Sequence, residues 1–458
     1  TEIYTLSLHD ALPIYIDFNI RCGNTLVGYA TEAQFDAANN LASDQEHRRE
    51  IKARIADLAD LFGRFREQQT KHGGQITAED KRRLREKLNA LGQELDRYLA
   101  RDYGIDPDAI SPLPSGEGPG VRAAFEKWRE SHQPFHWFSE FYGVMHEGGF
   151  DVVIGNPPWK EYSAVRQFYT VNGYATESCG NLYGLCTERA LALCHEASRF
   201  SFIVQLPLVC SSRMNTLREA MRNGSSLLWT ATFDDRPSKL FDGLQHCRST
   251  IFFVKRGKSH TKTFTTRYHR WPSANRPMLF YTIHLVLERY STQTSRIIAK
   301  HPKDLTASVF AKTRVCSTWS IGTFRIRRET SHYVFYQEAT QYWAKATSVL
   351  PFYAKNGVRS APAHGRYIYF EGANQAAATT ALLNSNLFYA YFIAYSDCFH
   401  LSDSLASGFP VTAELLADQK LAALNDQLMQ ELASHAERKT IISRRGGAID
   451  RIDRKSVV

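Results

Sequence analysis

The stretch that most constrains the fold is residues 150–159, a short apolar run that stops at two consecutive prolines. Residues 152–154, Val-Val-Ile, are β-branched, and such a run predicts a strand of a parallel sheet that is covered on both faces. Pro157 and Pro158 lack a backbone N–H, so they end the hydrogen-bonded ladder. Because open α/β sheets bind ligands beyond the carboxyl ends of their strands, we expect a binding edge at this point.

Composition and cysteine usage narrow the class of protein. The chain has 458 residues, of which 43% are hydrophobic, which is enough for two or three buried cores. Its eight cysteines form no Cys-x-x-Cys pair, and their spacing fits neither a zinc site nor a disulfide framework. The longest apolar run is too short to cross a bilayer, and no secretory signal is evident. These features predict a cytoplasmic protein with reduced thiols and without a membrane partner.

Basic residues are concentrated between Lys255 and Arg328. This stretch holds sixteen Lys or Arg residues against two acidic residues, Glu288 and Asp304, whereas the net charge of the whole chain is +9. Such an imbalance favours a surface that faces phosphates, although a solvated basic face is the alternative. The candidate DNA-binding residues are Lys255, Arg256, Lys258, Arg267 and Arg270.

Beyond Trp159 the hydrophobic pattern alternates between helix and strand, as a doubly wound sheet requires. The predicted helices span residues 181–197 and 216–222, and the predicted strands span residues 200–206, 227–233 and 250–255. Asp234, Asp235 and Lys239 fall between the last two strands. We expect these polar residues at the rim of the binding edge.

Two further regions have patterns of their own. Residues 38–104 are highly charged and carry two helical seams separated by a glycine-containing break, which predicts an antiparallel helical hairpin. Residues 135–141 are rich in aromatics, so His136 is expected to pack and not to act as a base. The C-terminal part predicts ordered segments at 349–358 and 367–370, one helix at 382–395, a polar turn at 397–401 and a charged helix at 413–438.

The tetrapeptide Asn156-Pro157-Pro158-Trp159 after an apolar strand resembles the Asn-Pro-Pro-aromatic motif of gamma-type N6-adenine DNA methyltransferases. The passage from Phe135 to Trp159 resembles the methyltransferase part of large restriction-modification enzymes. The resemblance implies that the Asn156 side-chain oxygen and the Pro157 carbonyl accept hydrogen bonds from the adenine amine. Its lone pair could then attack the methyl group of S-adenosylmethionine, and no metal is required.

The same resemblance implies two aromatic contacts to the base. Trp159 would stack on an adenine that has been flipped out of the duplex. Phe241 matches the aromatic that covers the second face of the base in related enzymes. The alternatives are a Pro-Pro turn with a buried Trp159 and a Phe241 that is simply part of the core.

The cofactor side of the resemblance is weaker. Residues 21–26 resemble a segment, usually Gly-Asp-x-Leu, whose acidic residue accepts a hydrogen bond from the adenine of S-adenosylmethionine. Asn24 stands in place of that acid, so the bond would lack charge, and a simple Gly-Asn turn explains the segment equally well. Asp151 is the second candidate cofactor-binding residue. The glycine-rich loop of these enzymes is not found before residue 151, so we expect this chain alone to bind S-adenosylmethionine poorly; micromolar affinity would contradict this.

The expected fold class is α/β: a partial, Rossmann-like S-adenosylmethionine-dependent methyltransferase sheet with an inserted helical hairpin and a C-terminal α+β target-recognition domain. In methyltransferases of this class, the first strand of the sheet lies beside the strand that carries the Asn156 motif. We expect this chain to lack that first strand, so the outer edge of the Asn156 strand would be unpaired. The expected parts are residues 1–15 as a non-native segment that resembles translated sequencing adapter, 16–37 with 125–257 as the partial catalytic domain, 38–110 as the hairpin, 258–438 as the target-recognition domain, and 439–458 as a tail whose last residues resemble the same artefact.

The resemblance, together with the basic stretch, implies an adenine-specific DNA methyltransferase of a restriction-modification system. It would act on double-stranded DNA, and a nuclease domain or subunit could accompany it in the parent protein. One alternative is a DNA-recognition fragment without chemistry. Another is a methyltransferase that acts on RNA or on a protein glutamine amide, which the basic stretch and the apparent specificity region disfavour.

Overall fold

The computed structural model describes residues 20–38, 46, 49–58, 60, 78–107, 121–243, 247–288, 297–339, 346–362, 364–442 and 448–452. The chain divides into two compact units. Unit 1 comprises Thr1–Val204, Thr216–Leu228 and Ile251–Thr261, and unit 2 comprises Gln205–Asn215, Trp229–Thr250 and Lys262–Val458. Within the described ranges, no helix is long and apolar enough to span a membrane.

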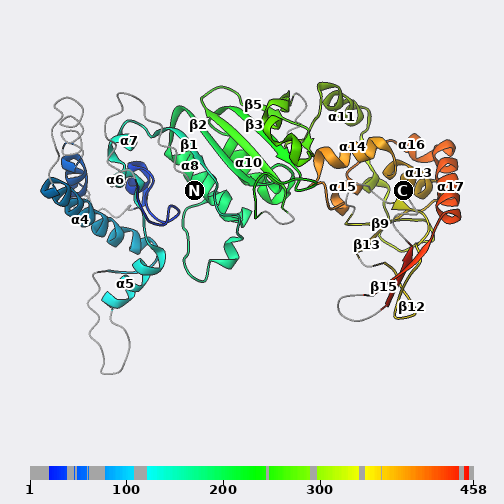
Figure 1. Cartoon of the computed structure of the whole chain (residues 1–458), viewed down its shortest axis with the longest axis horizontal. Coiled ribbons are helices and arrows are strands. Elements are labelled where there is room, and N and C mark those ends of the chain that lie inside the picture. Colours follow the sequence, from blue (N-terminus) through cyan, green and yellow to red (C-terminus); the bar gives the residue numbers. More distant parts are fainter. Residues whose placement is uncertain are drawn as a thin grey trace. The chain divides into compact units, whose positions relative to one another are not determined.

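One mixed sheet carries the strands that the alternating pattern predicts (Figure 1). Its strands are hydrogen-bonded in the order β1-β2-β4-β3-β5-β7, and β6 pairs with β3. They are β1 (Phe150–Gly155), β2 (Cys194–Gln205), β3 (Ser225–Phe233), β4 (Ser249–Arg256), β5 (Lys262–Thr265), β6 (Tyr268–His269) and β7 (Val286–Leu287). The β1–β2 and β3–β6 pairs are parallel, whereas β5 and β7 are antiparallel. The predicted α/β class is therefore confirmed.

Strand β1 differs from its prediction in one respect. Among the described residues it is an edge strand that pairs with β2 alone. Val152 is 59% exposed and Ile154 is 78% exposed, so the face that they share is open. The apolar run predicted a strand covered on both faces, and this is wrong because no described segment covers that face.

Helix α8 ends earlier than the pattern predicts. It spans Leu182–Leu193 and not 181–197, and Asn181 caps it by accepting a hydrogen bond from the Tyr183 N–H at 3.3 Å. β2 begins at once with Cys194, which pairs with Phe150 of β1. This pairing with a distant strand overrides the helical pattern of the residues that follow. The helix predicted at 216–222 is confirmed as α10 (Asn215–Arg222), and α9 (Pro207–Cys210) precedes it.

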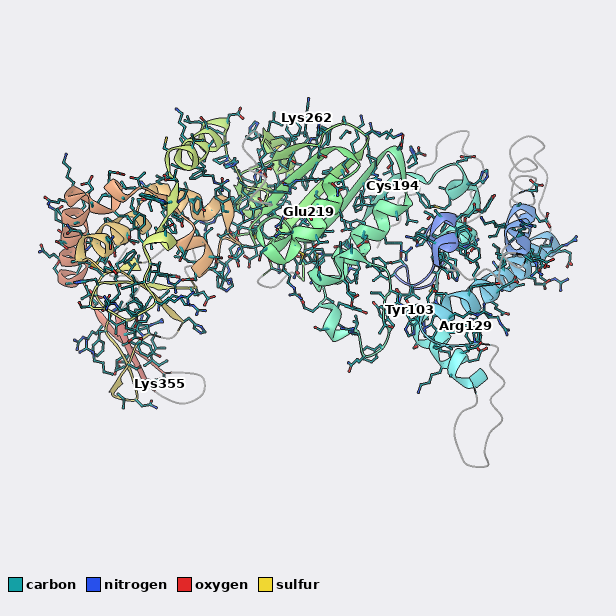
Figure 2. The ribbon with its side chains drawn as sticks, turned by 180° about the vertical axis from the view of Figure 1, so that it is seen from behind. Tyr103, Arg129, Cys194, Glu219, Lys262 and Lys355 are labelled. Carbon is teal, nitrogen blue, oxygen red and sulfur yellow. The ribbon has the colours of Figure 1, made fainter. Side chains whose placement is uncertain are left out.

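The core of unit 1 lies between this sheet and its helices. Phe200 and Phe202 of β2 pack against Phe252 of β4, with ring centroids 5.2 and 6.2 Å apart. On α8, a Cβ at Gly184 would lie 3.8 Å from Leu217 of α10, so the two helices approach closely there. Figure 2 shows the side chains from behind, with Cys194 at the start of β2 and Glu219 on α10.

The N-terminal part of unit 1 is helical. Its described helices are α2 (Glu32–Ala38), α4 (Ala78–Asp102), α5 (Val121–His132), α6 (Trp137–Glu140) and α7 (Tyr142–His146), and residues 49–58 are also helical. Arg54 and Glu94 form an ion pair at 2.8 Å, which joins the two arms of the predicted hairpin. The break at residues 72–75 lies outside the described residues.

His136 has a structural position, as its aromatic neighbourhood predicts. It is 3% exposed, accepts a hydrogen bond at Nδ1 from the Tyr29 N–H, and therefore donates from Nε2 to Asp96 at 3.1 Å. Arg129, labelled in Figure 2, donates to the other oxygen of Asp96 at 2.7 Å. This network ties α4 and α5 to the start of α6.

Most of unit 2 is formed by the part of the chain that comes after the strands of the large sheet. It contains three smaller sheets, ordered β10-β9-β13, β12-β11-β16-β15 and β14-β8. The strands are β8 (Trp319–Ser320), β9 (Tyr333–Gln337), β10 (Ala346–Thr347), β11 (Tyr353–Lys355), β12 (Val358–Arg359), β13 (Gly365–Tyr369), β14 (Pro410–Val411), β15 (Arg438–Ile442) and β16 (Ala448–Ile452). The helices are α11 (Asp304–Cys316), α12 (Ile321–Phe324), α13 (Ala373–Leu383), α14 (Asn386–Tyr395), α15 (Asp403–Ser407), α16 (Ala413–Ala417) and α17 (Gln419–Ser434).

Two helices predicted in this region are interrupted. The run 382–395 is split between α13 and α14, because the Asn384 side chain donates to the Ala346 carbonyl and the Ser385 side chain caps the next helix at the Phe388 N–H. The run 413–438 is split into α16 and α17 at Asp418, and its last residue already belongs to β15. In both runs polar side chains satisfy backbone groups at the break.

Two buried histidines make the stability of unit 2 sensitive to acid. Burial lowers the pKa of His269 and of His301 to about 4, helped by nearby cationic groups such as Arg314 beside His301. Because the unfolded chain binds these protons near pH 6.5, stability is lost as the pH falls from about 6.5 towards 4. Between pH 7 and pH 5, the titration of His301 should lower the free energy of unfolding by about 2 kcal/mol. We expect His301→Phe to abolish this part of the loss.

The measurement is the free energy of unfolding in urea at both pH values. Phenylalanine suits the site because the His301 ring lies against Phe310 and Tyr395, with centroids 6.1 Å away in each case. The control is His435→Phe at an exposed position, whose unfolding is measured at the same two pH values. An unchanged dependence in His301→Phe would contradict the assignment.

Candidate functional site

The Asn-Pro-Pro-Trp motif directly follows β1. Asn156 is exposed, Pro157 is buried and Trp159 is half-buried. Gly155 pairs with Phe202, and a Cβ at Gly155 would lie only 3.0 Å from the Phe202 ring. After Gly155 the chain therefore leaves the sheet beside the carboxyl-terminal half of β2.

Trp159 is fixed by a hydrogen bond to the neighbouring strand. Its indole N–H donates to the carbonyl of Ile203 at 3.1 Å. The bond satisfies the polar atom of the ring and holds the Trp159 side chain against β2. Asn156 remains exposed at the carboxyl end of a parallel strand, which is where ligands bind in sheets of this kind.

Phe241 lies in the link between β3 and β4, in unit 2. The link is held by Arg276, which donates to the carbonyls of Lys239 at 3.3 Å and Leu240 at 2.6 Å. Phe241 is half-buried. Its exposure is therefore intermediate between that expected of a ring that contacts a base and that expected of a core residue. Both alternatives for Phe241 stay predictions.

Unit 2 contains a cavity of about 470 Å³ at the ends of β2 and β3. Its walls come from the end of β2, from the β3–β4 link and from the turn after α14. The lining residues are Gln205–Pro207, Asp235, Arg236, Cys247, Arg248, Asp397, Phe399 and His400. The sequence pattern predicted Asp235 at the rim of the binding edge beyond β1, and no spacing in the sequence connects it with the distant turn that also lines this cavity.

Arg248 is the centre of the charged groups beside this cavity. It donates from Nε to the Tyr268 hydroxyl at 2.7 Å, and its guanidinium lies 3.4 Å from Asp234 and 3.7 Å from Asp235. Burial raises the pKa of Asp234, and its second oxygen is 3.2 Å from Arg270. Arg236 lies 3.9 Å from Asp235, so the group is a compact network of two carboxylates and three guanidiniums.

The polar turn predicted at 397–401 is present. One oxygen of Asp397 accepts from the backbone N–H groups of Phe399 and His400, and the other lies 2.7 Å from the His400 ring. Lys300 is 1% exposed and donates to the carbonyls of Ala394 and Ser396, at 3.1 and 2.7 Å. The buried Lys300 side chain at the end of α14 therefore fixes the chain from which the turn starts.

Asn24 lies in a turn that is bound to the segment before α6. Its side-chain oxygen accepts from the Leu26 N–H at 3.1 Å, and its backbone N–H donates to the Gln133 carbonyl at 2.8 Å. The local Gly-Asn turn that the sequence left open is thus present. The amide oxygen has a second lone pair, so it could still accept one bond from a ligand.

Asp151 lies at the other end of β1 from the motif. It is exposed and bonds to His195 Nε2 at 2.8 Å, which raises the pKa of that imidazole. Five residues of strand, at about 3.3 Å each, separate Asp151 from Asn156 by roughly 16 Å. The structure therefore does not bring these two predicted site residues together.

The five candidate DNA-binding residues occupy different places. Lys258 pairs with Glu196 near the start of β2, at the edge of unit 1 opposite the Asn156 end, and Lys255 and Arg256 end the adjacent strand β4. In unit 2, Arg267 and Arg270 flank β6, which runs beside the last residues of β3. The sequence count of basic residues could not separate these two groups.

Comparison with known proteins gives one family match. Residues 52–241 match the family model of the Eco57I restriction-modification methylases. The matched part contains α4, the Asn156 motif and strands β1 to β3. The match supports a similarity of this part of the chain to restriction-modification methylases, which are DNA methyltransferases. A comparison with curated proteins finds no match.

Solved restriction-modification enzymes are similar at low identity. The Type IIL enzyme MmeI in complex with DNA has a TM-score of 0.36 at 8% identity, over 74% of this chain and 56% of that chain. The Type ISP enzyme LlaBIII bound to DNA has a TM-score of 0.33 at 9% identity, over 88% and 40%. A nuclease-deletion mutant of LlaGI with a DNA substrate mimic has a TM-score of 0.27 at 12% identity, over 51% and 26%. The chain thus spans 26% to 56% of these proteins, and such TM-scores do not establish a common fold.

Proposed function

We propose that this chain is part of a DNA methyltransferase of a restriction-modification system that methylates the N6 amine of adenine. The observation that carries the proposal is the Asn156 motif, exposed at the carboxyl end of β1 inside the segment that matches the methylase family. The motif has the residue types that the reaction needs, and the segment that surrounds it matches the methylase family model.

In this proposal, the residues of the chain act on the acceptor. The amine of adenine is a poor nucleophile because its lone pair is delocalised into the ring. Asn156 Oδ1 and the Pro157 carbonyl accept its two hydrogens and favour a pyramidal nitrogen. Trp159, held by Ile203, stacks on the extruded base. S-adenosylmethionine, when bound, supplies the methyl group.

The described residues offer few contacts for that cofactor. Asn24 keeps one free lone pair, whereas Asp151 lies at the far end of β1. This set only partly fits S-adenosylmethionine, so we expect the chain alone to bind it weakly. A DNA-recognition chain without chemistry is the second candidate, and the incomplete cofactor contacts are the observation that favours it.

The test is the transfer of a labelled methyl group from S-adenosylmethionine to duplex DNA by the complete gene product. We expect transfer to unmodified DNA and none to DNA in which every adenine already carries an N6-methyl group. Equal transfer to both substrates would contradict adenine N6 as the acceptor. DNA binding without transfer in the first arm would favour the second candidate.

The placement of the basic residues gives a prediction about DNA binding. Arg267 is exposed beside the end of β3, so Arg267→Gln should weaken DNA binding and lower the slope of log affinity against log salt by about one. Lys258→Gln is the matched control, because Lys258 is exposed but paired with Glu196 at the other edge of its unit. The measurement is a salt titration of duplex binding by fluorescence anisotropy. A larger effect in Lys258→Gln would reverse the assignment.

A further inference from the structure

The segment between β6 and β7 carries large apolar side chains at the surface of unit 2. Met278 is 57% exposed, Phe280 is 60% exposed and Tyr281 is 81% exposed, and Leu285 is exposed as well. Single exposed apolar residues are common on protein surfaces, whereas a group of them marks a site of interaction. The candidate site described above uses none of these side chains. The group therefore indicates a second contact of unit 2.

The segment is anchored at several points. Two short 3-10 helices, η5 (Ser273–Met278) and η6 (Phe280–Thr282), form it. Trp271 before them and Leu279 between them are both buried. Arg276 donates to two carbonyls of the β3–β4 link, at 3.3 and 2.6 Å. The exposed side chains thus stand on a backbone that is already held in place, which lowers the entropic cost of binding.

The charge of the segment indicates a polyanion as its partner. Residues 262–287 contain one lysine and three arginines but no aspartate or glutamate. The three arginines, Arg267, Arg270 and Arg276, are all exposed. Cations beside exposed apolar side chains suit duplex DNA, because the phosphates attract the cations and the base stack can accept an apolar side chain.

A membrane with anionic lipids would attract the same charge. Membrane binding, however, grows with the apolar area that is buried in the lipid, and the elements that use it are amphipathic helices of many residues. The two short 3-10 helices of this segment offer only a small apolar tip. Insertion between two base pairs needs only a few apolar side chains, so the size of the tip favours DNA.

We propose that Met278, Phe280 and Tyr281 form an apolar wedge that inserts between neighbouring base pairs of duplex DNA, while the exposed arginines of the segment contact phosphates. The Phe280 ring lies 6.2 Å from the Phe233 ring, centre to centre, so it also braces the wedge against the end of β3. The choice of DNA as the partner rests on the proposed function. The insertion itself requires no methyl transfer.

The test compares two short duplexes of the same sequence, one intact and one with a central abasic site. The abasic site opens a gap in the stack, leaves every phosphate in place and offers no base to extrude. We expect the full chain to bind the abasic duplex at least about fivefold more tightly, because the wedge then has less stacking to break. The measurement is fluorescence anisotropy with labelled duplexes.

The double variant Met278→Ser, Tyr281→Ser should lose this preference and bind both duplexes alike. Its slope of log affinity against log salt should not change, since no cation is removed. Tyr281→Leu should keep the preference, because insertion requires an apolar side chain and not a hydroxyl. Leu305→Ser on α11 is the matched control, an exposed apolar residue of the same unit that should also keep it.

The proposal would be overturned by a preference that persists in the double variant. It would also be overturned if the unmodified chain bound the two duplexes equally or bound neither. Loss of structure is excluded as the cause in the double variant if Tyr281→Leu and the control retain the preference, because all the replaced side chains are exposed.

Two further measurements examine other partners of the wedge. Cosedimentation with vesicles of phosphatidylserine and phosphatidylcholine reports membrane binding, and analytical ultracentrifugation reports self-association. If either is lost in the double variant while the duplex preference is unchanged, the wedge belongs to a membrane or to a second copy, and the proposal is wrong. A duplex preference without methyl transfer would refute the proposed function alone, whereas transfer without the preference would refute the wedge alone.

Discussion

Replacing Asn156 with alanine is expected to lower the rate of methyl transfer by the complete gene product at least about a hundredfold, the scale seen when one oriented polar group is removed from an active site. The reason is the loss of one of the two acceptors that prepare the adenine amine, while the Pro157 carbonyl remains. Because Asn156 is exposed and no described contact of its side chain is lost, the fold should be unaffected. The measurement is single-turnover methyl transfer, together with DNA affinity.

DNA affinity should change little in this variant, since one neutral side chain is removed and no phosphate contact is lost. The matched control is Asn223→Ala, an exposed asparagine whose carbonyl accepts from Arg256 at the far end of β4. The control should retain both transfer and binding. Near-normal transfer by Asn156→Ala would remove Asn156 from the mechanism.

Replacing Arg189 with methionine should destabilise unit 1 by about 3 kcal/mol. Arg189 is 6% exposed and donates to the carbonyls of Leu26 and Gly28, at 3.3 and 2.8 Å, and to the Tyr174 hydroxyl at 2.8 Å. Methionine fills a similar volume but donates nothing, so these buried acceptors lose a charged partner. Burial also raises the pKa of Tyr174 to about 12, so its hydroxyl remains protonated in place.

The measurement is the free energy of unfolding in urea at neutral pH. Arg199→Met is the control, because Arg199 is an exposed residue of β2 and its loss should cost less than about 0.5 kcal/mol. Arg189 also holds the segment that follows Asn24 against α8. A variant with unchanged stability would show that this segment is held by other contacts.

The strand that ends in the Asn156 motif could be read from the sequence because its signals are local. β-branched residues and two prolines determine where a strand runs and where it ends, and helix α10 and strands β3 and β4 follow from the same kind of pattern. The end of α8 could not be read, since Cys194 is drawn into β2 by its pairing with Phe150. The break between α13 and α14 likewise depends on a bond between Asn384 and the distant Ala346.

The candidate site shows the same division between local and distant signals. The motif after β1 is contiguous, so its residue types could be assigned a role from the sequence. The cavity in unit 2 joins Gln205, Asp235 and Phe399, which no spacing relates to one another. Charge composition predicted a phosphate-facing surface, but only the structure separates Lys258 from Arg267, because charge counts carry no information about the edge of a sheet.

The most direct test of the account is the identity of the methylated base. Genomic DNA from cells that express the complete gene product, with or without Asn156→Ala, can be digested to nucleosides and measured by mass spectrometry. The account predicts N6-methyladenine with the unmodified protein and none above background with the variant. Methylation of cytosine instead, or equal N6-methyladenine in both samples, would contradict it.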